Sequence, residues 1–359
     1  QKMNNLIPTF TDITSWQKQN YVNTGGTRAK FVSLNQIGDV YYFKGSKETL
    51  EGDVRYPLEF WSEILSSKIG QLLGFNMLDY NIGYDSNHKQ KIGCLSKSMI
   101  DEKHERLTEG INYLKGFSPD YQPETDKKKY TFQFINEALK HHNIDSHLPH
   151  LIDIIIFDSI IGNSDRHQEN WGFIRKYIEL TIIESKKKIS ESVEKNNNFF
   201  DKIKHWFADK NKEVIKVSTE VKPIKKEFIN PRSSVFSPIY DSGCCLAREK
   251  SDEEIIRMNQ DDQLIERYVN KGKSEIHWEE NKITHLQLIK NLLESHEEAI
   301  KSRLSQIKEK YNRDDITSLV SNIDQSLPDF CCEYKIKKER KEVIIKIVNL
   351  RIDKLLSIL

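Results

Sequence analysis

The chain has 359 residues, of which 37% are hydrophobic and 30% are charged. This composition is typical of a folded, charge-rich globular protein and excludes a disordered or fibrous chain. The formal net charge of +1 creates no field over the whole molecule that would attract nucleic acid or an anionic membrane, so we predict no specific nucleic-acid partner. At roughly 150 residues per domain, the length predicts two lobes or domains.

The cysteines and the apolar runs indicate a reduced setting. Cys244 with Cys245, and Cys331 with Cys332, are adjacent pairs, and no zinc-binding spacing is present. We find neither a signal-peptide pattern nor an apolar stretch of membrane-spanning length in the printed sequence. We therefore expect a cytoplasmic protein, or one that is exported as an effector without a cleavable signal peptide.

The first hundred residues predict a small β-rich lobe. Residues 20–45 read as strands around a glycine turn, with residues 40–44 as one strand. Residues 57–74 predict a helix, because apolar side chains recur near helical spacing and Gly74 ends the pattern. Residues 75–100 return to strand character.

Helical patterns dominate from about residue 130. Residues 151–161 are strongly apolar and run directly into a polar loop, which predicts a buried helix that presents polar groups. Residue 255 to the end is also mostly helical, with an apolar stripe on one face. Together these patterns predict an α+β protein with two lobes: residues 1–100 form the small lobe, and residues 101–359 the helical lobe.

An insertion at about residues 176–231 interrupts the helical lobe. It contains thirteen lysines and nine acidic residues, which makes it the clearest local basic element of the chain. We expect it to be part helical and part mobile, and to be peripheral to the fold. Membrane contact through this insertion is a secondary expectation.

The run DRHQEN at residues 165–170 is the most informative motif. An Asp and an Asn five positions apart have the catalytic-loop spacing of protein kinases, in which the Asp accepts the proton of the substrate hydroxyl and the Asn holds metal bound to ATP. Asp241, which follows a strand-like segment, supplies a second metal ligand, because Mg²⁺ takes few protein oxygens and keeps phosphate ligands. We predict Asp165 as a catalytic residue and Asn170 and Asp241 as Mg²⁺ ligands. Either motif alone would also suit a capping loop or a turn.

Two residues of that loop keep open roles. Arg166 and His167 either brace the loop or contact phosphate, and we count His167 among the candidate nucleotide-binding residues.

Lys44 ends a strand ahead of the helix that contains Glu59 and Glu63. In kinases a strand lysine contacts the ATP phosphates and pairs with a helix glutamate, so Lys44 is a candidate for catalysis and nucleotide binding. The two glutamates lie four residues apart on one helical face, so periodicity does not choose between them. A solvated lysine at the end of a strand is the alternative interpretation.

Gly25 and Gly26, with Thr27, Arg28 and Lys30, form a candidate phosphate-binding turn. Its backbone N–H groups and local positive charge would suit phosphate oxygens. No Gly-Lys-Ser/Thr sequence follows, so the turn is not a Walker A motif, and an ordinary hairpin turn is the alternative.

Together these residues resemble the HipA-like serine/threonine kinases, in particular the compact HipT-like and CtkA-like members that lack the family's extra N-terminal subdomain. The matching stretches are residues 25–30, 42–44, 63–74, 161–173 and 238–243. The run around Asp165 is specific, whereas the glycine turn is not. The resemblance implies a two-lobed, protein-kinase-like fold that uses ATP and Mg²⁺ to phosphorylate a protein on serine or threonine.

The resemblance also implies residue roles. It makes Asp165 the catalytic base and places Lys44 on the phosphates. It favours Glu63 over Glu59, because the family's glutamate lies eleven residues before the glycine of a Leu-Gly pair. The adenine would lie near residues 96–100, so Ser98, Met99 and Ile100 are candidate nucleotide contacts.

A toxin or effector role follows from the same resemblance, with an antitoxin or a host protein as the expected partner. Such kinases phosphorylate themselves near the phosphate-binding turn, which here would mean Thr24, Thr27 or Ser33. A phosphate at that turn would place negative charge beside the ATP phosphates and inhibit the protein.

Two other interpretations remain open from sequence. A phosphoinositide-type lipid kinase uses a similar catalytic loop, although the 76 residues between Asp165 and Asp241 make an unusually long separation for that class. A catalytically inactive pseudokinase that only binds nucleotide is the other alternative, and the intact Lys44, Asp165, Asn170 and Asp241 argue against it.

Overall fold

The computed structural model describes residues 6–19, 28–49, 51, 53–188, 218–229 and 234–359. The chain divides into two compact units. Residues Gln1–Arg175 and Ser234–Leu359 form the first unit, and Lys176–Ser233 form the second.

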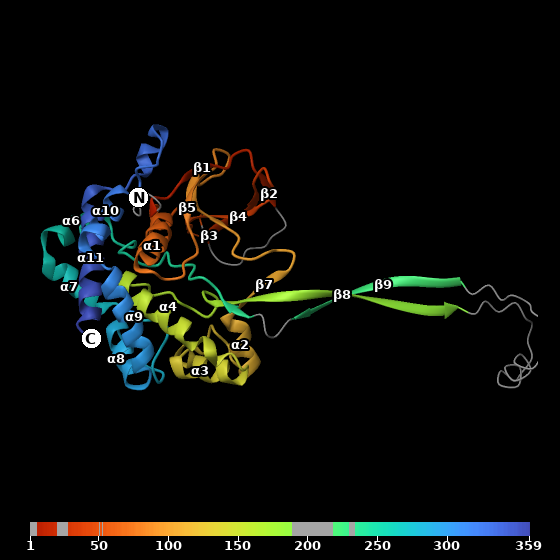
Figure 1. Cartoon of the computed structure of the whole chain (residues 1–359). Helices are drawn as coiled ribbons and strands as arrows, with labels where there is room; N and C mark the ends of the chain where they lie inside the picture. The colour runs from red at the N-terminus through yellow and green to blue at the C-terminus, as the bar shows by residue number, and fades with distance from the viewer. Residues whose placement is uncertain (1–5, 20–27, 50, 52, 189–217, 230–233) are drawn as a thin grey trace, which may run out of the picture. The chain divides into compact units, whose positions relative to one another are not determined.

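A six-stranded sheet forms the small lobe of the first unit (Figure 1). All neighbouring strands are antiparallel except β1 and β5, which are parallel. In spatial order the strands are β1 (Phe10–Asp12), β5 (Asn81–Tyr84), β6 (Ile92–Lys97), β4 (Val40–Lys47), β3 (Arg28–Leu34) and β2 (Gln17–Gln19). The expected strands at residues 28–45 and 75–100 are therefore confirmed, while the short strands β1 and β2 were not anticipated.

The hairpin of β3 and β4 positions Lys44 in this sheet. Its turn is held by Asn35, whose side-chain oxygen accepts hydrogen bonds from the N–H groups of Ile37 and Asp39. Gly38 has a φ of +85°, a left-handed conformation that glycine adopts without strain. The register that follows pairs Lys30 with Lys44 across the hairpin.

Helix α1 (Glu59–Leu73) packs against strands β4 and β6. Fourteen of its fifteen residues are buried, which explains why apolar residues are not confined to one narrow stripe. Gly74 ends the helix in the left-handed conformation with a φ of +83°, so the helix predicted over residues 57–74 is confirmed.

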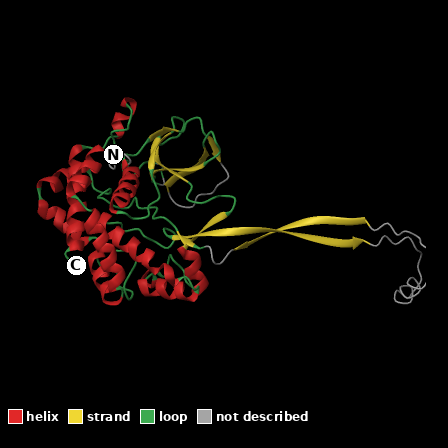
Figure 2. Cartoon of the chain, in the orientation of Figure 1, coloured by secondary structure: helices red, strands yellow, loops and turns green. Residues whose placement is uncertain are grey.

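The large lobe of the first unit is helical (Figure 2). Its α-helices are α2 (Gly110–Phe117), α3 (Phe132–His141), α4 (Leu148–Ile161), α6 (Asp252–Gln260), α7 (Asp262–Lys271), α8 (His285–Ser295), α9 (Glu297–Lys310), α10 (Arg313–Asn322) and α11 (Lys338–Leu356). Short 3₁₀ helices lie at Lys127–Lys129, Asp145–His147 and Asp329–Tyr334. Within the described part of the chain, no helix is long and apolar enough to span a membrane.

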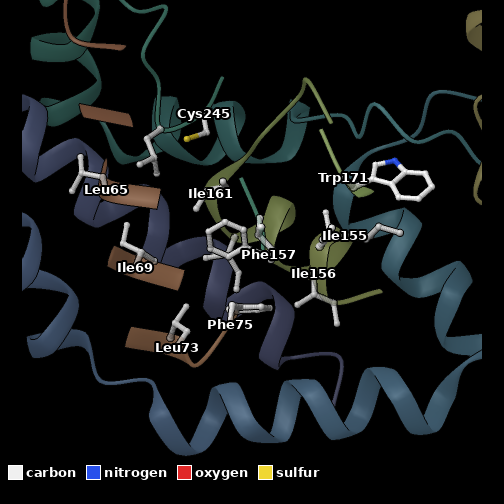
Figure 3. Close-up of a cluster of buried hydrophobic side chains, with 14 of the residues drawn as sticks. Leu65, Ile69, Leu73, Phe75, Ile155, Ile156, Phe157, Ile161, Trp171 and Cys245 are labelled. Carbon is white, nitrogen blue, oxygen red and sulfur yellow. The ribbon is translucent and has the colours of Figure 1, made fainter. Parts of the chain in front are cut away.

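Helix α4 is the centre of this lobe and packs against α8, α9 and α11. Ten of its fourteen residues are buried and most of them are apolar, as expected for a helix covered by neighbours. Figure 3 shows its side chains meeting those of α1, where Leu65, Ile69 and Leu73 are spaced four residues apart. Phe157 of α4 packs on Phe75 with ring centroids 5.1 Å apart. The predicted buried helix ahead of the polar loop is therefore confirmed.

A second sheet follows the polar loop. In it β8 (Gly172–Lys188) lies between β7 (Glu105–Glu109) and β10 (Val235–Phe236). Phe173 and Ile174 pair with Phe236 and Val235, so the two ends of the first unit that flank the insertion are neighbours.

The insertion differs from its prediction. In its described residues, β8 continues beside β9 (Ser218–Ile229) as an antiparallel ladder from Tyr177 opposite Ile229 to Lys188 opposite Ser218. The expectation of partial helix is wrong for these residues, because they are rich in Ile, Thr and Val, which favour strands. Residues 189–217, which carry the asparagine run and two apolar islands, lie outside the described residues.

Candidate active site

The polar loop after α4 brings Asp165 and Asn170 together. Gly162 ends α4 with a φ of +70°, and the chain then turns through Asn163, whose side chain donates to Asp158 at 3.0 Å. The side-chain amide of Asn170 donates to the backbone carbonyl of Asp165 at 2.8 Å, which closes the loop. This bond uses the amide nitrogen and leaves the oxygen of Asn170 as the atom available to a cation.

Arg166 braces the loop from below. Its side chain is 1% exposed and donates to both carboxylate oxygens of Asp158, at 2.9 and 2.8 Å. It also donates to the carbonyls of Asn170 and Tyr240 and to the hydroxyl of Ser242. Burial alone would lower the pKa of Arg166, but Asp158 beside it raises that pKa above its ordinary value. One guanidinium therefore fixes both candidate metal-binding segments, and of the two roles left open by sequence it takes the bracing one.

Lys44 joins the two lobes at the same place. Its ammonium forms an ion pair with Glu63 and another with Asp241 at 2.5 Å. The Lys44 side chain is 9% exposed and that of Glu63 is 1% exposed, so this pair is shielded from water. The second oxygen of Glu63 accepts a hydrogen bond from the N–H of Ser242 at 2.8 Å. The strand, the helix and the candidate metal-binding segment are thus linked through the side chains of Lys44 and Glu63.

The structure distinguishes the two helix glutamates. Glu59 accepts a hydrogen bond from the N–H of Lys47 at 2.8 Å and lies 3.0 Å from the guanidinium of Arg248. It is Glu63 that pairs with Lys44.

A cavity of about 560 Å³ lies over these groups, between the two lobes of the first unit. Predicted site residues that line it are Lys30, Lys44, Ser98, Met99, Ile100, Asp165, His167, Asn170 and Asp241. Glu63 reaches the site through Lys44 instead of lining the cavity. Gly25, Gly26 and Thr27 lie outside the described residues, and Arg28 is placed only as the first residue of β3.

The end of the cavity opposite the carboxylates has the features of a base-binding pocket. Residues 98–100 follow β6, and the N–H of Ser98 donates to the carbonyl of Val40 at 2.8 Å. Tyr42, Leu78 and Leu107 add apolar surface to the wall. Apolar walls with a few polar groups are the usual form of a small-ligand site.

Acidic groups gather near Asp165 and Asn170. Glu109 and Glu169 also line the cavity. Burial raises the pKa of Glu109 above its ordinary value, the charge of Glu169 raises it further, and Lys30 lowers it. Excess negative charge at this end suits a bound cation, which fits the donor set: one amide oxygen and one carboxylate leave room for phosphate ligands on Mg²⁺. Among the described residues, no cluster of three or more His, Cys, Asp or Glu forms a separate metal site.

Cys244 is a neighbour of Asp165 that the sequence did not reveal. Its thiol donates to a carboxylate oxygen of Asp165 at 3.1 Å, and Arg248 donates to its sulfur at 3.0 Å. Tyr80 is a neighbour of Asp241 that the sequence also did not reveal: its hydroxyl accepts a long hydrogen bond from the N–H of Asp241 at 3.5 Å. Burial raises the pKa of Tyr80 well above its ordinary value, and Glu63 adds to the shift, so the phenol stays neutral.

Some of the missed cavity residues had a sequence signal and others had none. Glu169 and Tyr240 adjoin predicted site residues, so proximity in sequence could have included them. Leu78, Leu107 and Glu109 carry no motif and enter the site only through folding.

Ser33 was a candidate for self-phosphorylation, but it is 0% exposed within β3. The strand would have to open before a kinase could reach its hydroxyl, so this candidate is wrong for the folded chain. Thr24 and Thr27 lie outside the described residues.

Comparisons with known proteins agree at the level of structure. No family model matches the chain, and no curated protein sequence matches it. Among solved structures it is similar to the proinflammatory kinase CtkA of Helicobacter pylori, with a TM-score of 0.67 and 16% sequence identity. The alignment covers 98% of this chain and 97% of that one. The two-lobed α+β fold predicted from the HipA-like motifs is thereby confirmed, and the chain has the fold of the CtkA kinase.

Proposed function

We propose that the chain is a phosphotransferase that uses ATP and Mg²⁺ to phosphorylate serine or threonine in a protein. The observation that carries the proposal is the position of Lys44 between Glu63 and Asp241, on the wall of the cavity that also holds Asp165 and Asn170. A lysine paired with a helix glutamate, together with a metal-binding Asp, is the arrangement that phosphoryl transfer in kinases requires. The kinase fold of the structural neighbour supports the same function.

Each residue has a role that follows from its place. Asp165 accepts the proton of the attacking hydroxyl and orients it, because its carboxylate faces the cavity beside Asn170. Asn170 and Asp241 would hold Mg²⁺ through their side-chain oxygens, and a bound metal nucleotide would supply the transferable phosphoryl group. Lys44 would bind the phosphates, and residues 98–100 would receive the adenine.

The biological setting is part of the proposal. By resemblance to HipA-like kinases, the chain acts as a toxin or an effector, phosphorylates itself, and is controlled by an antitoxin or binds a host protein.

The proposed nucleotide contacts lie on the cavity wall, at Ser98, Met99, Ile100, Lys30 and His167.

The test is transfer of labelled phosphate from Mg·ATP, by the purified chain alone and with cell lysate, followed by mass spectrometry of the labelled sites. Asp165→Asn should lower turnover about 100-fold or more while nucleotide binding is kept, because only the base is removed. Asp241→Asn should weaken Mg-dependent nucleotide binding as well. Asp314→Asn, an exposed change in α10, is the matched control and should leave both unchanged.

Near-wild-type turnover in either site variant would overturn the assignment. Phosphoinositide vesicles are included as a second acceptor. Labelling of lipid without labelling of protein would support a lipid kinase instead, and nucleotide binding without any transfer would support a pseudokinase.

A further inference from the structure

Arg351 of α11 is a buried arginine without a carboxylate partner. It is 5% exposed, and one of its terminal nitrogens donates to the carbonyl of Ser159 in α4 at 3.1 Å. Its Nε has no hydrogen-bond partner, and the guanidinium forms no ion pair with any residue that the structure describes. A buried cation that lacks a negative partner is costly, so the fold has a reason to supply an anion here.

The other buried arginines show what is usual in this molecule. Arg166 is paired with Asp158, and Arg340, in the same helix as Arg351, donates to Asp252 at 3.1 Å. The carboxylate that interacts electrostatically with Arg351 is Glu249, which forms no ion pair with it and is hydrogen-bonded to Tyr268.

His285 lies beside this arginine and is also unsatisfied. It is the first residue of α8, is 3% exposed, and neither ring nitrogen has a hydrogen-bond partner in the described part of the chain. Burial, together with the charges of Arg351 and Lys282, lowers the pKa of His285 to about 3. At neutral pH the ring is therefore uncharged, with one N–H to donate.

A small cavity joins these groups. Its volume is about 80 Å³, and its walls come from the end of α7, the start of α8, the last turns of α11 and Ser159 of α4. Both side chains lie close to Gly272. A methyl group placed on this glycine would lie 2.8 Å from the Arg351 guanidinium and 3.4 Å from the ring of His285. Lys354 stands on the cavity wall.

The first turn of an eleven-residue helix adds a further attraction for negative charge. Helix α8 begins at His285; the N–H of His285 donates to the carbonyl of Gly272 and that of Gln287 donates to the hydroxyl of Thr284, so the helix contributes the positive end of its dipole and not a row of free donors. An arginine fork, a neutral imidazole donor and a helix N-terminus are complementary to the several oxygens of a tetrahedral anion.

Capping of α4 is the simpler explanation for Arg351. Its bond to the Ser159 carbonyl does serve the last turn of that helix. The cap uses one donor of five and leaves Nε of Arg351 and both ring nitrogens of His285 without hydrogen-bond partners in the described part of the chain. A buried water could satisfy a nitrogen, but it would not supply a negative charge.

We propose that the cavity between α4, α7, α8 and α11 binds a phosphate-sized oxyanion through Arg351 and His285, at the N-terminus of α8. The site is separate from the candidate active site and goes beyond the proposed kinase activity. Its ligand is either free phosphate or the phosphate group of a small monoester, because both present the same oxygens.

The test is thermal unfolding of the full-length chain with inorganic phosphate, in chloride buffer of matched ionic strength and without nucleotide. A ligand that binds only the folded state should raise the Tm by about 3 °C when its concentration is about ten times its Kd. Arg351→Met should lose this response. Arg340→Met is the matched control: the same helix loses a buried arginine that already has a carboxylate, so its phosphate response should remain.

His285→Gln provides a second variant in case Arg351→Met does not fold, and it should weaken phosphate binding at least 5-fold. The absence of a phosphate response in the wild-type chain would overturn the proposal. An unchanged response in Arg351→Met or His285→Gln would also overturn it, because the anion would then be binding elsewhere, such as at the nucleotide site. O-phosphoserine is compared at equal concentration: a larger shift than with phosphate identifies a monoester, and an equal shift identifies the free ion.

Discussion

Two buried arginines lie near the end of α4 and are treated in opposite ways. Arg166 has every part of its guanidinium bound, with Asp158 as a bidentate carboxylate. Arg351 contacts the same helix through one carbonyl and faces a cavity. A buried arginine whose donors are all bonded to protein groups stabilises the fold. A buried arginine with unbonded donors is available to bind a ligand. By this criterion Arg166 is a bracing residue and Arg351 is a candidate binding residue, although neither role follows from a sequence motif.

The largest effect should come from breaking the satisfied arginine. Arg166→Met leaves Asp158 buried without a partner and frees two backbone carbonyls, so the free energy of unfolding should fall by about 3–5 kcal/mol. Phosphotransfer should be lost as well, since Asn170 and Asp241 lose their shared support. Urea denaturation and the kinase assay measure the two effects.

The double variant Arg166→Met with Asp158→Asn sharpens this test. It should recover part of the lost stability, because the uncompensated carboxylate is removed too. A double variant no more stable than Arg166→Met would show that the carboxylate is not the cause.

The next effect concerns the ion pair of Lys44. Glu63→Gln should lower turnover roughly 10- to 100-fold, because kinase catalysis needs the lysine held by its helix glutamate. Stability should change much less, since Asp241 still contacts Lys44. Glu59→Gln is the matched change four residues away and should affect turnover less than Glu63→Gln, because its partner Arg248 reaches Asp165 only indirectly, through Cys244. Equal losses of turnover in the two variants would contradict the pairing.

The dependence of stability on pH tests the unsatisfied region. The pKa of His285 is about 3 in the folded chain and near 6.5 when unfolded, so the unfolded state binds more protons between these values. Stability from this residue is complete above pH 6.5 and is lost as the pH falls toward 3. Between pH 7 and pH 5 the loss should be about 2 kcal/mol. His285→Gln should flatten the curve over this range, and an unchanged slope would refute the assignment.

The smallest effect is expected from the insertion. We propose that residues 180–230 are peripheral and serve the choice of substrate or partner, so a short Gly/Ser linker in their place should leave the Tm and self-phosphorylation nearly unchanged. Labelling of the true substrate in lysate should decrease. The pairing of Phe173 with Phe236 stays in the shortened chain and keeps its ends together. Unfolding of this variant would instead make the insertion part of the core.

The sequence predicted the fold well where local patterns decide it. Helix α1 and helix α4 follow from their apolar residues and terminal glycines, and the kinase-type loop follows from the spacing of Asp165 and Asn170. The two ends of the insertion were misjudged because lysine clusters concealed the β-branched residues between them. In these segments the charged composition masks the strand character of the β-branched residues.

Contacts between distant segments could not be predicted. The thiol of Cys244 reaches Asp165 across 79 positions, and Arg351 reaches Ser159 across 192. Neither pair shares a motif, and both depend on how helices and loops pack once the whole core has formed. Candidate site residues with a motif were therefore available from sequence, while those that complete the cavity were not.

The pairing of β8 with β10 has a consequence for how such a chain could have grown. Because Phe173 and Phe236 are neighbours, the chain leaves the first unit and returns to it at adjacent points. An insertion between two chain ends that are already neighbours requires no rearrangement of the segments on either side. Additional length in the insertion carries only a small entropic penalty. The two candidate site segments, around Asp165 and around Asp241, can thus become widely separated in sequence during evolution while they remain in contact in space.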